Sequence, residues 1–166
     1  MEDESAAVAR RLKKAERGAI ALVPVPPEVD TRVAVLRLAK ALAQIGAERV
    51  AIVDAGARWP VGPEDPTEDA IFTRRSVEGI PVLAPRVPGA AAMAALKRLL
   101  ESRVRPFRHL LVDLSGLEAQ GEHLAAAALS DGVVLVAEAG RTREAELEAV
   151  RRELLPAQLV GVVLVG

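Results

Sequence analysis

The sequence contains no cysteine and no tyrosine, and these absences exclude several kinds of chemistry. Without cysteine there is no disulfide, no thiolate nucleophile and no thiolate metal ligand, and two histidines are too few for a typical zinc site. Without tyrosine the chain has no phenol that accepts a phosphoryl group. We therefore expect no resident metal and no cofactor, with carboxylates as the remaining metal ligands.

The sequence also lacks an excess of charge and a long apolar run. Lys+Arg number 22 and Asp+Glu 23, so the net charge is −1 and nothing draws the whole chain to nucleic acid. The start, MEDES, is acidic where a secretory signal needs basic residues. Apolar runs such as residues 132–137 are far shorter than the ~20 residues of a membrane-spanning helix. We expect a cytoplasmic protein without direct membrane insertion, associated with a membrane through a partner if at all.

Short β-branched runs alternate with longer helical patterns along the 166 residues. This alternation is typical of βαβ units, and it predicts one domain, residues 1–166, of three-layer α/β architecture around a mostly parallel sheet. The runs are nearly all apolar, so we expect every strand to be central. The predicted strands are residues 19–25, 49–54, 80–84, 109–114, 132–137 and 159–165.

The helical patterns differ in how much of each helix they predict to be buried. Residues 31–45 are apolar almost all round, which predicts a largely buried helix, and residues 90–102 form a second helix. A third begins with Thr142 as N-cap. The N-terminal segment, residues 1–16, is predicted as a helix with a solvated basic face, and the Pro-rich acidic residues 59–70 as a surface loop.

Two predicted strands end in a carboxylate, Asp54 and Asp113. Ligands of open parallel sheets bind beyond the carboxyl ends of the strands, and strand-end aspartates of this kind hold Mg²⁺ or a water in phosphoryl-transfer enzymes. Such an aspartate also caps the turn that follows it. The sequence alone leaves both interpretations open.

The segment ALVPVPPEVDTRVAVLRLAKALAQIGAERVAIVDAGARWP resembles the first part of the bacterial tyrosine kinases, in the deviant-Walker group of phosphate-loop ATPases. Asp54, Arg58 and Pro60 match the family's Asp-x-Asp-x-Arg-x-Pro pattern, with Gly56 replacing the second Asp. The resemblance continues through PFRHLLVDLSG and LSDGVVLVAEAGRTREAELEAVRREL to LVGVVLVG. It implies a P-loop NTPase-like fold and a place in exopolysaccharide biosynthesis.

The phosphate loop is where the sequence departs from that family. Pro26 and Pro27 have no N–H to offer a phosphate, Val29 stands where glycine is expected, and Glu28 and Asp30 are acidic. Asp30 takes the position of the family's lysine, or Thr31 takes it if the register shifts by one residue. A carboxylate ~4 Å from a phosphate costs about 1 kcal/mol in water and about 4 kcal/mol at an effective dielectric of 20. We therefore expect no useful binding of ATP or GTP.

The family's oligomerisation motif falls near Ala7, Arg10 and Lys13, where its acidic residue is absent. The sequence therefore does not decide whether the chain forms a homo-oligomer. Trp59 is either a binding anchor in its loop or packed against the body of the protein. The remaining interaction candidates are Arg58, Arg141 and Arg143.

We interpret the chain as a non-catalytic pseudokinase that acts by binding a protein. The resemblance implies a polysaccharide chain-length-determining membrane protein or an active kinase subunit as that partner. Two alternatives stand: a divergent ATPase or kinase with Asp54 as base and Asp113 as Mg²⁺ ligand, and a ParA-like partitioning or positioning protein.

Overall fold

The computed structural model describes residues 4–14, 18–46, 49–59, 64, 71–87, 89–102, 107–117 and 121–166. The elements in chain order are α1 (Glu4–Lys14), β1 (Ala19–Val25), α2 (Arg32–Gln44), β2 (Val50–Asp54), β3 (Phe72–Val77), β4 (Ile80–Pro85), α3 (Ala90–Glu101), β5 (His109–Asp113), α4 (Glu122–Ala128), β6 (Gly132–Glu138), α5 (Glu144–Leu154) and β7 (Leu159–Val165). None of the helices in these ranges has the length and apolarity to cross a bilayer.

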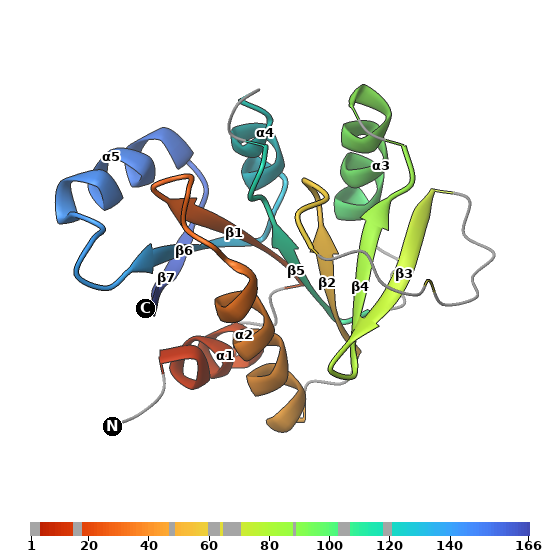
Figure 1. The fold of residues 1–166 in the computed structure, drawn as a ribbon, viewed down its shortest axis with the longest axis horizontal. Helices are drawn as coiled ribbons and strands as arrows, with labels where there is room; N and C mark the ends of the chain where they lie inside the picture. Colours follow the sequence, from red (N-terminus) through yellow and green to blue (C-terminus); the bar gives the residue numbers. More distant parts are fainter. Residues whose placement is uncertain are drawn as a thin grey trace.

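The strands form one seven-stranded sheet in the order β3-β4-β2-β5-β1-β6-β7, and Figure 1 shows it between two layers of helices. All neighbouring strands are parallel except β3, which runs antiparallel to β4. The predicted three-layer, mostly parallel α/β fold is therefore confirmed. The strand β3 was not predicted, and most of the predicted surface loop 59–70 lies outside the described residues.

Each face of the sheet has its own apolar core. On one face α1 and α2 pack against Ile20, Leu22, Ile52 and Leu111, and on the other α3, α4 and α5 pack against the alternate residues of the same strands. Alternation along a strand therefore sends neighbouring residues into different cores. Full burial of a leucine stabilises by about 1.5–3 kcal/mol, so the two cores together hold this arrangement.

Two predictions about burial were too broad. In α2 the apolar residues Ala34, Val35, Leu38, Ala39 and Leu42 are buried. The opposite face is not, because Val33 is 52% exposed. The strand β7 is apolar yet lies at the edge of the sheet rather than in its centre. The helix α1 covers part of that edge, where the Leu164 N–H donates to Glu4 Oε2 at 2.9 Å.

The predicted N-cap of α5 was also wrong. The helix begins after Arg143, whose extended backbone (φ −90°, ψ 147°) makes it the N-cap, and its N–H donates to Glu146 Oε2 at 2.8 Å. The Thr142 hydroxyl instead accepts the Glu138 N–H at 2.8 Å and donates to the Val25 carbonyl at 2.7 Å. Thr142 therefore ties the loop after β6 to the end of β1.

Candidate functional site

The two strand-end carboxylates lie side by side at the carboxyl edge of the sheet. The strands β2 and β5 are hydrogen-bonded neighbours with Asp54 directly opposite Asp113 in the register. Both side chains continue the alternation of Ile52 and Leu111, so they lie on the α2 face. Both are buried, with Asp54 3% and Asp113 0% exposed. The structure therefore brings together the two aspartates that the sequence singled out.

Asp113 is enclosed by hydrogen-bond donors from three separate segments. The Thr31 hydroxyl lies 2.9 and 2.8 Å from its two carboxylate oxygens. The N–H and hydroxyl of Ser115 donate to Oδ1 at 3.0 and 2.7 Å. The indole N–H of Trp59 donates to Oδ2 at 2.9 Å. Both oxygens therefore already have donors, which is the usual way in which a buried carboxylate is satisfied.

Asp54 fixes the loop that follows its own strand. Its two carboxylate oxygens accept the backbone N–H groups of Arg58 at 2.8 Å and Trp59 at 3.0 Å. Burial raises the pKa of Asp54 above its usual value, and the charge of Asp113 adds to the rise, while the two N–H donors oppose it. The turn-capping interpretation of Asp54 therefore has direct geometric support. The hydrogen bond from the Trp59 N–H to Asp54 also fixes the backbone of Trp59.

Of the two interpretations of Trp59, packing against the body is the one that the structure shows. The side chain is 8% exposed and belongs to the core on the α2 face. The backbone N–H of Trp59 is held by Asp54 and its indole N–H by Asp113, so one residue links both carboxylates. Because the link spans 54 positions between Trp59 and Asp113, no local pattern in the sequence announces it.

The loops after β2 and β5 are in close contact at two glycines. A Cβ on Gly56 would lie 2.1 Å from the carbonyl oxygen of Ser115, closer than non-bonded atoms approach. A Cβ on Gly116 would lie 2.8 Å from the Nε of Arg58. Gly56 occupies the position of the second Asp in the related pattern. An aspartate there is therefore incompatible with this arrangement of the two loops.

The phosphate-loop segment connects β1 to α2, and several of its residues have no free N–H for a phosphate. Pro26 and Pro27 have no N–H, the Val29 N–H donates to the Pro26 carbonyl at 3.1 Å, and the Arg32 N–H donates to Asp30 at 3.0 Å. A hollow of about 250 Å³ lies here, lined by Pro27, Glu28, Val29, Asp30, Thr31, Arg32, Arg58 and Ser115. Two residues of the loop therefore have no amide to offer a phosphate, and two further amides are already used within the loop.

The charges around this hollow differ from what the sequence suggested. Asp30 is ion-paired with Arg32, whose Nη2 lies 2.7 Å from Oδ2. The hydrogen bonds from Arg32 lower the pKa of Asp30 below its usual value, and Asp30 raises the pKa of Arg32 in return. Arg32 was not among the predicted site residues. Arg32 therefore largely compensates the expected repulsion of a phosphate by Asp30. The features that still disfavour a nucleotide are the two prolines of the loop and the enclosure of Asp113.

The contact between Thr31 and Asp113 also bears on the register of the loop. In P-loop NTPases the loop Ser/Thr and a strand-end Asp share the Mg²⁺ ion. Thr31, in direct contact with Asp113, takes the position of that hydroxyl, so Asp30 takes the position of the lysine. This contact therefore favours the register in which Asp30, and not Thr31, takes the lysine position. Ser115 was not among the predicted site residues, although the Asp-x-Ser spacing of an Asx-turn is a recognisable signal for it.

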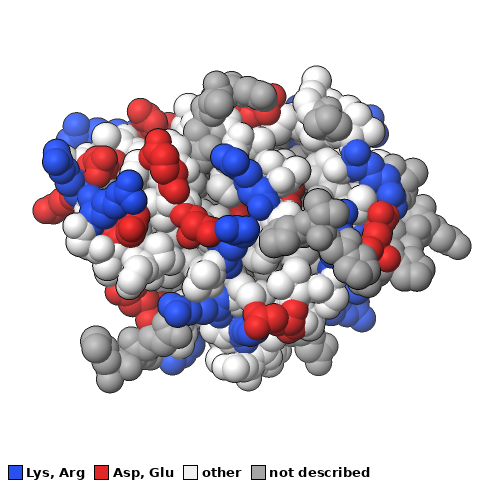
Figure 2. All heavy atoms as spheres, viewed as in Figure 1, with Lys and Arg blue, Asp and Glu red and all other residues white. Residues whose placement is uncertain are grey.

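The remaining interaction candidates make no hydrogen bond to Asp113, whose donors among the described residues are Thr31, Trp59 and Ser115. Arg58 is exposed and lines the hollow. Arg141 is ion-paired with Glu138, at 3.2 Å, and Arg143 caps α5. Figure 2 shows Lys and Arg intermixed with Asp and Glu over the viewed face, so no band of one sign crosses its described part.

No family model and no curated protein sequence matches the chain. Several solved structures match its fold, among them the following three. The tyrosine kinase domain of BceF is 19% identical with a TM-score of 0.68, over 96% of this chain and 73% of that one. The chimerical protein CapA2B2 is 18% identical with a TM-score of 0.74, over 97% and 82%. The kinase domain of VpsO is 17% identical with a TM-score of 0.67, over 96% and 94%. The chain therefore has the fold of bacterial tyrosine kinase domains, as the resemblance in its sequence predicted.

Proposed function

We propose that this protein is a pseudokinase: a kinase-like P-loop domain with a disabled phosphate site, which acts as a protein-interaction or regulatory module in exopolysaccharide biosynthesis or export. The observation that supports it most is the hydrogen bond from the Trp59 indole to Asp113. A hydrogen-bond donor on the carboxylate occupies a lone pair that a Mg²⁺ ion would need. Mg-ATP would have to displace Trp59, and with it the loop that Asp54 holds.

The energetic balance favours the closed arrangement. A hydrogen bond to a charged group contributes about 1.5–3 kcal/mol, and an unsatisfied buried donor costs about as much again. A phosphate-binding loop would repay this with convergent amides and a lysine. Here the loop has two prolines, and Asp30 stands in the place of the lysine. Little remains to offset the loss of the Trp59 contact.

The proposed partner is the cytoplasmic part of a polysaccharide chain-length-determining membrane protein or an active kinase subunit. The support is the likeness to kinase domains, together with a surface that the loss of catalysis would leave intact. The experiment measures binding of the purified protein to each candidate by interferometry, with and without Mg-ATP. We expect binding that is independent of nucleotide and unchanged by Thr31→Val, with Thr31→Ser as the matched control. Binding that requires Mg-ATP, or none to either candidate, contradicts the proposal.

A divergent ATPase is the second candidate, because Thr31 and Asp113 keep the pairing that holds Mg²⁺ in P-loop enzymes. Arg32 and Arg58 would then supply positive charge beside the hollow. This candidate predicts Mg²⁺-dependent release of phosphate that Asp113→Asn abolishes while the circular dichroism spectrum stays unchanged. Our proposal predicts no release above that of a heat-denatured sample.

A further inference from the structure

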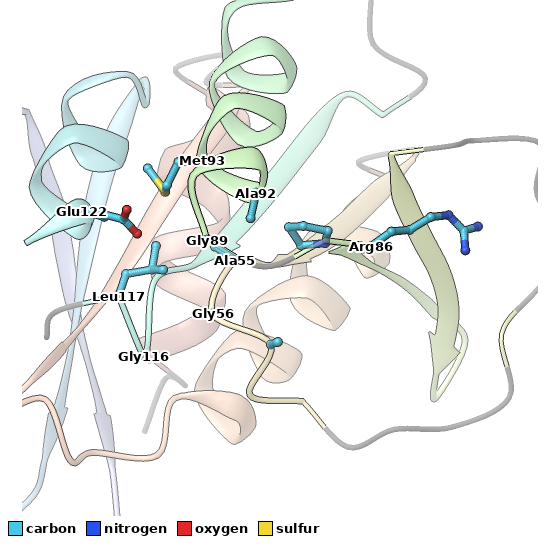
Figure 3. A pocket seen from close by; sticks show the side chains of 11 residues that line it. Ala55, Gly56, Arg86, Gly89, Ala92, Met93, Gly116, Leu117 and Glu122 are labelled. Atoms are coloured by element: carbon cyan, nitrogen blue, oxygen red, sulfur yellow. The ribbon is translucent and has the colours of Figure 1, made fainter. Parts of the chain in front are cut away.

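A second cavity lies on the opposite side of the paired loops, against α3 and α4 (Figure 3). Its volume is about 400 Å³, within the range of about 300–1,000 Å³ typical of small-molecule sites. It is formed where β2, β4 and β5 end, so it belongs to the edge at which open α/β sheets bind ligands. Among the described residues that line it, none is a candidate phosphate or metal ligand such as Thr31, Asp54 or Asp113.

The walls of this cavity are mostly apolar. Ala55 and Leu117, both 8% exposed, form one side, and Ala92 and Met93 of α3 form another. Three glycines, Gly56, Gly89 and Gly116, add bare backbone to the lining. A ligand that enters this cavity therefore needs an apolar body.

Within the described part of the chain, two charged residues line the cavity, and their environments differ. Arg86 is ion-paired with Glu64 at 2.7 Å, and Figure 3 shows its side chain extending away from the other labelled side chains. Glu122 has no hydrogen-bond or ion-pair partner among the described residues. In Figure 3 its carboxylate lies on the same side of the cavity as Met93 and Leu117. Among the described residues, the charge beside the apolar walls that has no ion-pair partner is therefore negative.

We propose that this cavity binds a small organic cation, an ammonium or guanidinium group on an apolar body, with the cation at Glu122 and the body between Met93 and Leu117. Glu122 also stands at the first residue of α4, where a helix favours an acid. That effect accounts for an acid at this position but not for the cavity beside it. The start of α3 contributes about half a positive charge, which opposes a cation less strongly than the full charge of Glu122 attracts one. The inference does not depend on the proposed function.

The chain offers a specific probe for this site. It has two methionines, Met1 and Met93, so methyl-labelled methionine gives one NMR signal from the cavity, which Met93→Leu assigns. We would titrate phenethylamine against 2-phenylethanol, its neutral counterpart, and 3-phenylpropionate, an anion. We expect saturable shifts of Met93 by the amine alone, with a dissociation constant of about a millimolar, as befits a ligand of this size.

Variants separate the charge from the cavity. Glu122→Gln should weaken amine binding about tenfold, the usual loss when a hydrogen bond to a charged group becomes neutral. Ala92→Leu, which fills the cavity, should abolish binding. Glu144→Gln, at the equivalent first position of α5, should leave amine binding unchanged. Thermal melts establish that each variant is folded.

Several results would overturn the proposal. These are equal shifts by the amine and the alcohol, tighter binding of the carboxylate, binding that survives both Glu122→Gln and Ala92→Leu, and no saturable shift at about 10 mM amine, roughly ten times the expected constant. Nucleotide binding elsewhere in the protein would leave these readouts unchanged, so failure here is distinguishable from failure of the pseudokinase proposal.

Discussion

Replacing Trp59 by Phe removes the indole N–H from Asp113 and keeps an aromatic ring in the core. The lost hydrogen bond to a charged group should cost about 1.5–3 kcal/mol, and the smaller ring leaves a void worth about 1 kcal/mol. We expect a loss of about 2.5–4 kcal/mol in the free energy of unfolding. For a domain of this size that corresponds to about 5–15 °C in Tm.

A double-mutant cycle tests whether the loss comes from this contact. Trp59→Phe and Asp113→Asn are measured singly and together by urea denaturation followed by far-UV circular dichroism. We expect a coupling of more than about 1 kcal/mol, because the two side chains are in direct contact. Coupling below about 0.5 kcal/mol, the usual error of additivity, would refute the link between them.

A matched cycle controls for a general effect of Trp59 on stability. Asp131 is a carboxylate at the opposite edge of the sheet, just before β6 begins, and it accepts the Ala19 N–H at 2.7 Å. Trp59→Phe and Asp131→Asn should therefore be additive. Coupling in this cycle as large as in the first would show that the first does not report the contact.

Three further predictions concern the same edge of the sheet. Gly56→Ala should destabilise the fold by about 1–3 kcal/mol in urea denaturation, because its Cβ meets the backbone of Ser115 at 2.1 Å. Thr31→Val should cost about 1.5–3 kcal/mol through the lost hydroxyl contact with Asp113, whereas Thr31→Ser should be nearly neutral. Since burial raises the pKa of Asp54 above 3.8, its contribution to stability should fall as the pH rises from about 4 through the raised pKa. Asp54→Asn should lessen that fall between about pH 4 and pH 7, measured by urea denaturation.

Each of these has an outcome that contradicts it. A Gly56→Ala variant with an unchanged free energy of unfolding would mean that the two loops separate at little cost. Thr31→Ser as unstable as Thr31→Val would mean that the hydroxyl is not what matters. A stability difference between wild type and Asp54→Asn that stays constant with pH would show that Asp54 has the same pKa in the folded and unfolded states.

The strands that the sequence predicted are those with a continuous apolar run. The run at residues 19–25 and that at residues 159–165 match β1 and β7 without adjustment. The strand β3, FTRRSV, was not predicted because it is polar at alternate positions. It lies at an edge of the sheet, where its pairing with β4 rather than its own composition defines it. The edge position of β7 was not predicted because its apolar composition is that of a buried strand.

The site residues, like the strands, were predictable only where the signal is local in the sequence. Asp54 and Asp113 were predictable because a carboxylate at the end of an apolar run is a local signal. The link from Trp59 to Asp113 and the contact of Thr31 with Asp113 join segments far apart in the chain. The pairing of Asp30 with Arg32 was closer at hand, two residues apart, and its omission made the loop look more repulsive than it is.

We propose that the protein itself closes its phosphate site. Calorimetric titration of Mg-ATP into the wild-type protein, with Trp59 fluorescence recorded in parallel, tests it most directly, because Trp59 is the single tryptophan. We expect no saturable heat and no change in fluorescence up to about 1 mM nucleotide, which corresponds to a binding free energy weaker than about −4 kcal/mol. A micromolar dissociation constant, accompanied by a change in Trp59 fluorescence and lost in Asp113→Asn, would contradict it.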